Sequence, residues 1–308
     1  MGMPTDIGVI DTMMGTRAGK GAKLNYANLT GIKDADSGRM NFPAQYMFKD
    51  VPYSDQARSA GEAGDVGDQA EPEPPQGADL VLPFMDKHDI EIAMIGVAPG
   101  DDKSPARDAI DRFPDRFVGA HEPDPNDVMG SIRTIKELHA QGYLKAVAAF
   151  PAGRNPQVAI DDPKMYAIYA TCVELDVPIF CCAGIPGPRV PYAVQHPKLI
   201  DEVMYDFPDL RFVTRHGCEP WEDLAVKLML KWPGLHYSTS AFAPKYYPRA
   251  IIDYANSRGA DKVIYGGYFP MGLHIDKIFE QLPAVPFKDE VWPKFLRENA
   301  ARVLNLGA

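Results

Sequence analysis

Apolar stretches of two kinds alternate along most of the chain. Short runs of mostly apolar residues bounded by turn formers predict buried strands, and stretches with an apolar residue every three or four positions predict helices. After a first strand that starts at Val9, we expect strands at residues 90–97, 117–121, 143–150, 177–182, 210–216, 235–238 and 262–266. Helices are expected at residues 80–88, 105–113, 126–140, 163–175, 197–206, 221–231 and 248–258, with a further helical region from about residue 275 onward. This alternation predicts parallel β-α-β units.

The number of predicted strands points to one barrel domain. Eight strands in 308 residues favour a closed (β/α)8 TIM barrel over an open doubly wound sheet, so we interpret residues 1–308 as a single domain. Residues 17–79 are expected to form an irregular insertion after the first strand. Within it, residues 59–79 are rich in Gly, Pro and acidic residues, which predicts a mobile loop or lid.

Four segments share a pattern in which a predicted strand runs into a turn marked by Gly or Pro. They are residues 9–15 (VIDTMMG), 177–184 (VPIFCCAG), 212–217 (FVTRHG) and 263–270 (VIYGGYFP). In order and spacing they resemble the amidohydrolase-related family that includes aminocarboxymuconate semialdehyde decarboxylase. The resemblance implies a barrel with its active site where the strands end, at the carboxyl-terminal face.

The resemblance breaks down at the positions where the family holds its metal. The family's first strand normally ends in Asp-Thr-His-x-His, its fifth in a His before Gly, and its eighth in Gly-Ser-Asp-Tyr-Pro. The matching residues here are Met13, Gly15, Cys182 and Tyr268. A zinc site needs about three ligands from His, Asp, Glu or Cys, and Met and Tyr are poor zinc ligands. We therefore expect no metal cofactor, and a zinc site rebuilt with His121 or Glu219 is the alternative.

The sixth-strand histidine of the family is kept, as His216. Imidazole titrates near neutral pH and can move protons, and the resemblance implies a catalytic acid/base role. Tyr268 has a phenol that can donate a hydrogen bond to an oxyanion. The competing interpretations are that His216 is a remnant of a metal site and that Tyr268 only fills the abandoned pocket.

Cys182 permits another mechanism, in which His216 activates its thiol to attack a carbonyl. The competing interpretation is a buried, inert cysteine. Arg189, on a Pro/Gly-rich loop after the fifth strand, suits a substrate carboxylate or phosphate, or else forms a surface ion pair. The other candidate substrate-binding residues, which lie near predicted strand ends or on an aromatic or apolar lining, are Arg17, Met13, Phe150, Trp221 and His121.

Composition narrows the range of partners. A net charge of −10 argues against a nucleic-acid or anionic-membrane partner. No apolar run approaches the roughly 18 residues of a transmembrane helix. Four cysteines without CxxC spacing fit a reducing cytoplasm. We expect a small-molecule substrate and a homo-oligomer.

These observations favour a metal-independent amidohydrolase-like enzyme with His216 as acid/base. Its reaction would be hydrolysis or carbon–carbon lyase chemistry, including decarboxylation, on a small carboxylate or carbonyl compound with an apolar or aromatic body. Two alternatives remain open. One is a non-catalytic barrel that binds a ligand or partner subunit, and the other is a metal hydrolase with displaced ligands.

Overall fold

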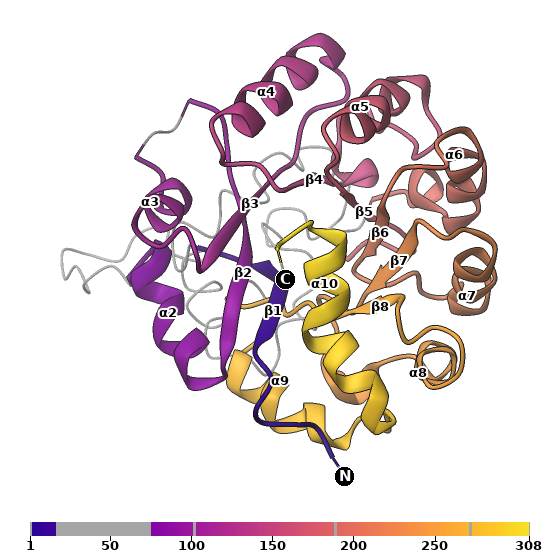
Figure 1. Cartoon of the computed structure of the whole chain (residues 1–308). Coiled ribbons are helices and arrows are strands. Elements are labelled where there is room, and N and C mark those ends of the chain that lie inside the picture. Colours follow the sequence, from indigo (N-terminus) through magenta and orange to yellow (C-terminus); the bar gives the residue numbers. More distant parts are fainter. Residues whose placement is uncertain (1, 17–74, 101–102, 188–189, 271–272, 308) are drawn as a thin grey trace, which may run out of the picture.

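The computed structural model describes residues 2–16, 75–100, 103–187, 190–270 and 273–307. Its centre is a sheet of eight strands in which every neighbouring pair is parallel and the spatial order follows the sequence (Figure 1). The strands are β1 (Val9–Met14), β2 (Ile90–Gly96), β3 (Phe117–His121), β4 (Ala146–Ala149), β5 (Ile179–Cys182), β6 (Phe212–Arg215), β7 (Leu235–Ser238) and β8 (Val263–Ile264). The sheet curls into a nearly closed barrel with helices between its strands, which confirms the (β/α)8 prediction.

Side chains of β1 link the first strand to the last. Thr12 Oγ1 donates a hydrogen bond to the Tyr265 carbonyl at 2.7 Å. The amide of Gly267 donates to Asp11 Oδ1 at 2.8 Å. These two bonds hold β1 against the short β8 and its following turn, so the barrel is closed there by side chains of the Asp-Thr pair.

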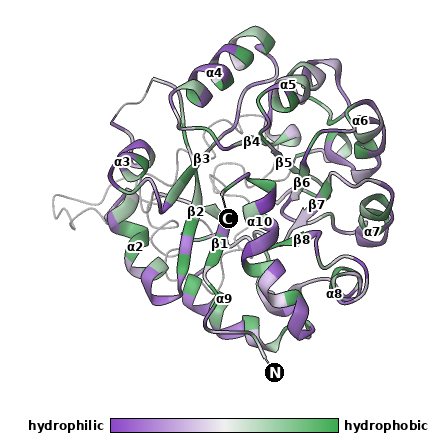
Figure 2. Ribbon diagram, viewed as in Figure 1, coloured by the Kyte–Doolittle hydropathy of each residue, from purple (hydrophilic) through white to green (hydrophobic). Residues whose placement is uncertain are grey.

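Helices surround the strands as a ring (Figure 1). They are α2 (Gly77–Lys87), α3 (Pro105–Arg112), α4 (Val128–Ala140), α5 (Pro163–Glu174), α6 (Ile200–Asp206), α7 (Glu222–Lys231) and α8 (Arg249–Ala255). The polar residues of these helices lie mainly toward the outside and the apolar ones toward the strands (Figure 2). Helix starts depend on capping: Asp127 and Asp162 accept backbone N–H bonds from Gly130 and Lys164, so the helix predicted from residue 126 begins at Val128.

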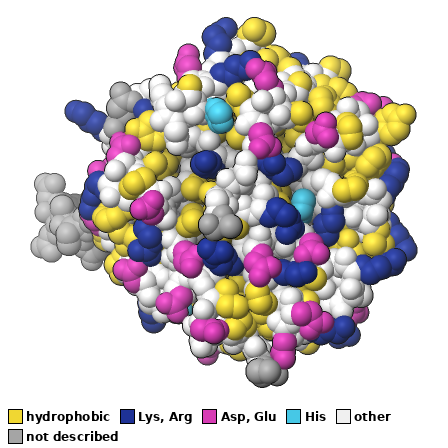
Figure 3. All heavy atoms as spheres, in the orientation of Figure 1, with side chains coloured by type: hydrophobic (Ala, Val, Ile, Leu, Met, Phe, Trp, Pro, Cys, Tyr) yellow, Lys and Arg dark blue, Asp and Glu magenta, His cyan; other side chains and the backbone are white. Residues whose placement is uncertain are grey.

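The C-terminal segment fills the amino-terminal end of the barrel. After α9 (Ile275–Gln281), a π-helical turn (Lys294–Glu298) leads into α10 (Asn299–Val303). Ala300, Val303 and Leu304 pack on an inner cluster contributed by the strands: Ile10, Met94, Val118, Ala120, Ala146, Phe180, Val213 and Ile264. Figure 1 looks onto this end, with α10 over the middle of the strands. On the same face, positive and negative side chains are interspersed (Figure 3). The plugged end therefore leaves the carboxyl ends of the strands for chemistry.

The expected insertion is described only at its end. Residues 17–74, with Arg17 and most of the segment 59–79, lie outside the described residues, so the expected mobility stays a prediction. The last residues of that segment belong to α2, since the helix begins at Gly77 and buries Ala78 and Leu80. Within the part of the chain that the structure describes, no helix has the length and apolar character needed to cross a membrane.

Candidate active site at the carboxyl ends of the strands

His216 follows directly after β6 and has an unusual backbone conformation. Its φ is 64° and that of Gly217 is 75°, which places both in the left-handed region. For a residue other than Gly this conformation costs roughly 1–3 kcal/mol, and it persists only where the surroundings enforce it. Here Ser240 Oγ accepts the His216 backbone N–H at 3.1 Å and lies 3.0 Å from Nδ1 of the ring. Ser240, after β7, therefore fixes both the turn and the direction of the imidazole.

The structure brings the two predicted catalytic residues together. The rings of His216 and Tyr268 meet edge to face, with centroids 5.1 Å apart and an interplanar angle of 81°. Both residues are half-buried. His216 follows β6 and Tyr268 follows β8, so each comes from the carboxyl end of its strand. An imidazole and a phenol therefore meet at the carboxyl ends of the strands.

The surroundings of His216 favour its neutral form. Burial lowers its pKa well below 6.5, the neighbouring Arg215 charge lowers it further, and a bond with the backbone of Ser240 opposes these effects. The imidazole is therefore uncharged at neutral pH. A neutral imidazole carries one lone pair, so it can accept a proton.

A cluster of charged residues that the sequence analysis missed lies at the same mouth. Arg215, the last residue of β6, donates from Nε to Cys182 Sγ at 3.3 Å and from Nη2 to Glu122 Oε2 at 2.9 Å. The other oxygen of Glu122 accepts from Nη2 of Arg154 at 2.8 Å. One carboxylate thus bridges two guanidinium groups. The signal in the sequence was strand alternation, because Val213 faces the barrel interior and Arg215 lies two residues further on.

Arg215 and Glu122 hold each other in the charged state. Burial opposes the charge of Arg215, but its contacts with the Cys182 sulfur and the Glu122 carboxylate outweigh burial, so the pKa of the guanidinium is raised. Burial likewise works against the Glu122 carboxylate, and the two arginines outweigh it and lower its pKa. With two positive groups and one negative group, the cluster carries a surplus positive charge.

Cys182, at the end of β5, is 4 % exposed. Burial raises the pKa of its thiol, although the Arg215 guanidinium beside the sulfur works in the opposite direction. The sulfur of Cys182 is hydrogen-bonded by Arg215. The ring of His216, which was expected to activate this thiol, contacts Ser240 and Tyr268 instead. A protonated thiol follows at neutral pH, and the nucleophile role of Cys182 stays a prediction that this geometry does not support.

Comparison with known families identifies the chain. The sequence profile of the family described as Amidohydrolase matches residues 55–306. The chain belongs to the amidohydrolase family. This confirms the resemblance drawn from the strand-end motifs, and it supports an enzyme of the hydrolase or lyase type. No curated protein matches this amidohydrolase.

Solved structures share the fold of this amidohydrolase. An uncharacterised TIM-barrel protein from Bordetella bronchiseptica is 22 % identical, with 97 % of this chain and 99 % of that chain covered and a TM-score of 0.72. A 5-carboxyvanillate decarboxylase from Novosphingobium aromaticivorans, in complex with manganese and 4-hydroxy-3-methoxy-5-nitrobenzoic acid, is 17 % identical over 98 % and 97 % of the chains, TM-score 0.65. A 2,6-dihydroxybenzoate decarboxylase from Rhizobium is 15 % identical over 97 % and 99 % of the chains, TM-score 0.62.

The donor atoms that the described residues place at this mouth do not fit a metal ion. Within the described ranges, no group of three or more His, Cys, Asp or Glu side chains is placed to hold an ion. The thiol of Cys182 is already bonded to a guanidinium, which repels a cation. His121 directs Nδ1 to the Val97 carbonyl at 3.0 Å, and Glu219 Oε1 accepts the Tyr237 hydroxyl at 3.1 Å. Among the described residues, neither His121 nor Glu219 belongs to a group of three potential zinc ligands.

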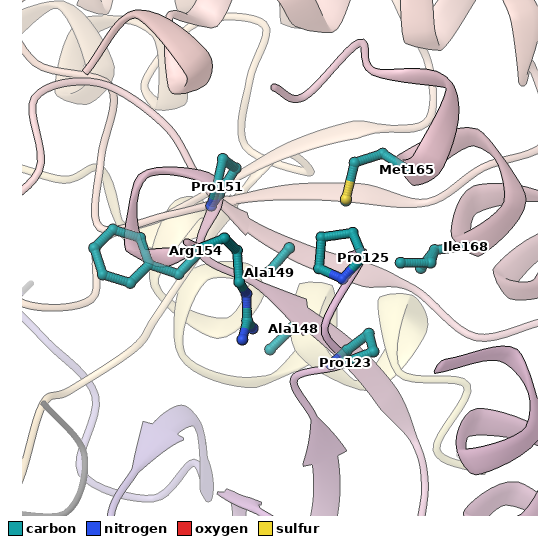
Figure 4. Close-up of a pocket in the computed structure, with 9 residues that line it drawn as sticks. Pro123, Pro125, Ala148, Ala149, Pro151, Arg154, Met165 and Ile168 are labelled. Carbon is teal, nitrogen blue, oxygen red and sulfur yellow. The ribbon is translucent and has the colours of Figure 1, made fainter. Parts of the chain in front are cut away.

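Phe150 lines a small apolar hollow beside the charged cluster. Figure 4 shows this hollow with Pro123, Pro125 and Pro151 around it, together with Arg154. It has room for about one water molecule at most. The hollow therefore cannot hold a substrate, and its apolar walls pack the stem of Arg154.

The remaining predicted substrate contacts are partly placed. Trp221 packs against His196, with ring centroids 4.1 Å apart, and against Tyr192 at 5.4 Å. Met13 is half-buried near the end of β1. His121, at the end of β3, is 8 % exposed, and burial lowers its pKa. Arg17 and Arg189 lie outside the described residues.

Proposed function

We propose that this amidohydrolase is a metal-independent hydrolase or carbon–carbon lyase that acts on a small carboxylate or carbonyl compound with an apolar or aromatic body. The observation that carries the proposal is the contact between His216 and Tyr268 at the carboxyl ends of β6 and β8. A proton acceptor and a hydroxyl donor side by side are the groups needed to take a proton while an oxyanion develops.

His216 is the proton-transfer group in this proposal. Its lowered pKa keeps it neutral and ready to accept a proton at neutral pH. Ser240 acts as a positioning residue, because its hydroxyl holds both the backbone N–H and the ring of His216. The strained turn supports a functional role, since a side chain without one gains nothing from a conformation that costs roughly 1–3 kcal/mol.

Tyr268 would supply the stabilising hydrogen bond. A phenol hydroxyl donates to a carbonyl oxygen, and this bond strengthens as negative charge develops there. The family's metal would polarise a substrate in this place, and the donor set that the described residues offer does not fit that ion. The function therefore rests on the protein's own imidazole, phenol and guanidinium groups.

The test is a turnover screen of carboxylated aromatic compounds, cyclic keto acids and lactones with metal-free protein. His216→Asn is the informative variant, because Asn tolerates the left-handed backbone better than most residues. His139→Asn is the matched control, since His139 lies in the last turn of α4 on the outer ring of helices. We expect turnover by the parent and the control, and its loss in His216→Asn. Activity that appears only after manganese or zinc is added, or that His216→Asn retains, would refute the proposal.

A further inference from the structure

Arg215 stands inside the barrel mouth, where a charged residue is unexpected. Phe180 and Val213 belong to the inner cluster of the barrel. Two residues further along their strands, Cys182 and Arg215 face the same way and are paired in the ladder between β5 and β6. Cys182 occupies the family's fifth-strand ligand position. The guanidinium is therefore next to a place where a relative with the family motif holds its metal.

The described residues match the charge of Arg215 only in part. Arg215 is 9 % exposed, and the carboxylate that pairs with it among these residues, that of Glu122, is shared with Arg154. Nε and Nη2 have partners, whereas no partner for Nη1 is found among the described residues, and this nitrogen is not among the fully enclosed atoms. A desolvated guanidinium with an accessible donor is poised to accept a further anion.

We propose that Arg215, backed by Arg154, binds a carboxylate of the substrate, so that a fixed guanidinium replaces the metal ion as the positive centre of the barrel mouth. This inference rests on the proposed function, because it supplies the subsite that orients the substrate. His216 is the next residue along the chain, so a carboxylate on Arg215 brings the neighbouring carbon atoms toward the imidazole and Tyr268.

The substitution of guanidinium for metal also accounts for the altered ligand positions. A guanidinium stays protonated at any physiological pH and needs no ligands. Once it supplies the positive charge, the imidazole and carboxylate side chains of the family motif have no ion to hold. Met13, Gly15 and Tyr268 at those positions are consistent with that loss.

The experiment compares binding of benzoate with binding of benzamide, a neutral compound of nearly the same shape, by calorimetry in the presence of EDTA. We expect wild-type protein to bind benzoate at least about tenfold more tightly than benzamide, as a charge-assisted contact is worth more than a neutral one. Equal affinities, or no detectable benzoate binding, would overturn the subsite. Stoichiometric bound metal with benzoate binding abolished by EDTA would overturn it as well.

Three variants locate the effect. Arg215→Met keeps most of the side-chain volume and should remove the preference for benzoate. Glu122→Gln removes the competing carboxylate, so benzoate should bind several-fold more tightly, which a purely structural ion pair would not produce. Arg112→Met is the control, because Arg112 pairs with Asp79 and Asp108 on the exposed face of α3. If Arg215→Met fails to fold, the affinity of Glu122→Gln for benzoate still tests the subsite. Unchanged or weaker benzoate binding by Glu122→Gln would overturn it.

Failure of the subsite and failure of the function give different results. Turnover that depends on His216, combined with equal binding of benzoate and benzamide, removes the subsite and leaves the proposed function. Selective benzoate binding that needs Arg215, without turnover of any compound screened, supports the anion-binding subsite and refutes the proposed enzymatic function.

Discussion

Ser240 Oγ lies 3.0 Å from Nδ1 of His216 and accepts the backbone N–H of the same residue at 3.1 Å. One hydroxyl thus controls the position of the imidazole and the strained turn that carries it. Ser240 is fully buried, so its hydroxyl has few competing partners. We therefore expect Ser240 to act as a positioning residue whose replacement has a measurable effect on turnover.

We expect Ser240→Ala to fold and to lower kcat by about tenfold to a hundredfold, because a misdirected acid/base group loses much of its typical contribution of about 10²–10⁴-fold. The backbone of Ser240, whose bond raises the pKa of His216, remains in this variant, so the acidic limb of kcat/KM should stay where it is in the parent enzyme. An unchanged kcat would show that the Ser240 hydroxyl does not position the imidazole. Ser257→Ala, which removes a hydroxyl from the exterior after α8, is the control.

The pH dependence of the parent enzyme follows from the same pKa. A base must be neutral to act, and His216 becomes protonated only well below pH 6.5. We therefore expect kcat/KM to stay level as pH falls through 6.5 and to decline only at lower pH. Arg215 lowers the pKa of His216, so Arg215→Met should move this acidic limb to higher pH. An unchanged limb in a folded Arg215→Met variant would contradict the assignment.

Tyr268→Phe removes one hydroxyl and leaves the aromatic contact with His216 in place. Loss of one oxyanion donor lowers kcat by about 10²–10³-fold, so we expect a decrease of that order with little change in the melting temperature. Steady-state kinetics on a substrate from the screen provides the measurement. A near-normal rate would show that Tyr268 fills space and would transfer the oxyanion role to another donor.

Much of the fold was predictable because each strand and helix carries its own periodicity. For example, the apolar runs at β5 and β6, separated by an amphipathic helix, predicted parallel strands of a barrel. The ends of elements were less accurate: the strand expected at 143–150 is β4 at Ala146–Ala149, because only these residues pair with their neighbours. Pairing is a tertiary property that hydrophobicity alone does not show.

The contact between His216 and Tyr268 was predictable because a barrel brings all its strand ends to one face, whereas their catalytic roles remain predictions. Arg215 was not predicted, because inward-facing positions of buried strands are expected to be apolar and this one carries a charge. Glu122 and Arg154 lie in loops after β3 and β4, where the sequence gives no rule for side-chain direction. Ser240 was missed for the same reason. Homo-oligomerisation and location in the cytoplasm remain predictions.

The side chains at the barrel mouth predict that the purified protein holds little metal. We expect dialysed protein to contain far less than one zinc, manganese or iron per chain, because Arg215 hydrogen-bonds Cys182 and repels cations from it. EDTA should leave turnover unchanged. Elemental analysis alongside an activity assay measures both. About one metal ion per chain, lost together with activity on chelation and recovered when the ion is returned, would restore the interpretation of a metal hydrolase with displaced ligands.

Asp11 predicts an unusual dependence of stability on pH. The carboxyl is fully buried, and its Oδ2 has no hydrogen-bond partner among the described residues. Burial raises its pKa from 3.8 to about 7, although bonds from Gly267 and Met13 oppose this. A carboxyl whose pKa is raised in the folded state favours unfolding as pH rises from about 4 to 7, because only the unfolded chain ionises easily in that range. A pKa difference of about three corresponds to roughly 4 kcal/mol.

Asp11→Asn keeps the acceptor oxygen and removes this titration. Between pH 5 and pH 8, the free energy of unfolding of the wild type should therefore fall by a few kcal/mol relative to that of Asp11→Asn. Denaturant unfolding at the two pH values measures the difference, and Asp115→Asn, whose carboxyl lies in the exposed turn before β3, is the control. Parallel pH dependence of wild type and Asp11→Asn would show that Asp11 is ionised in the folded protein, balanced by a partner that its hydrogen bonds do not reveal.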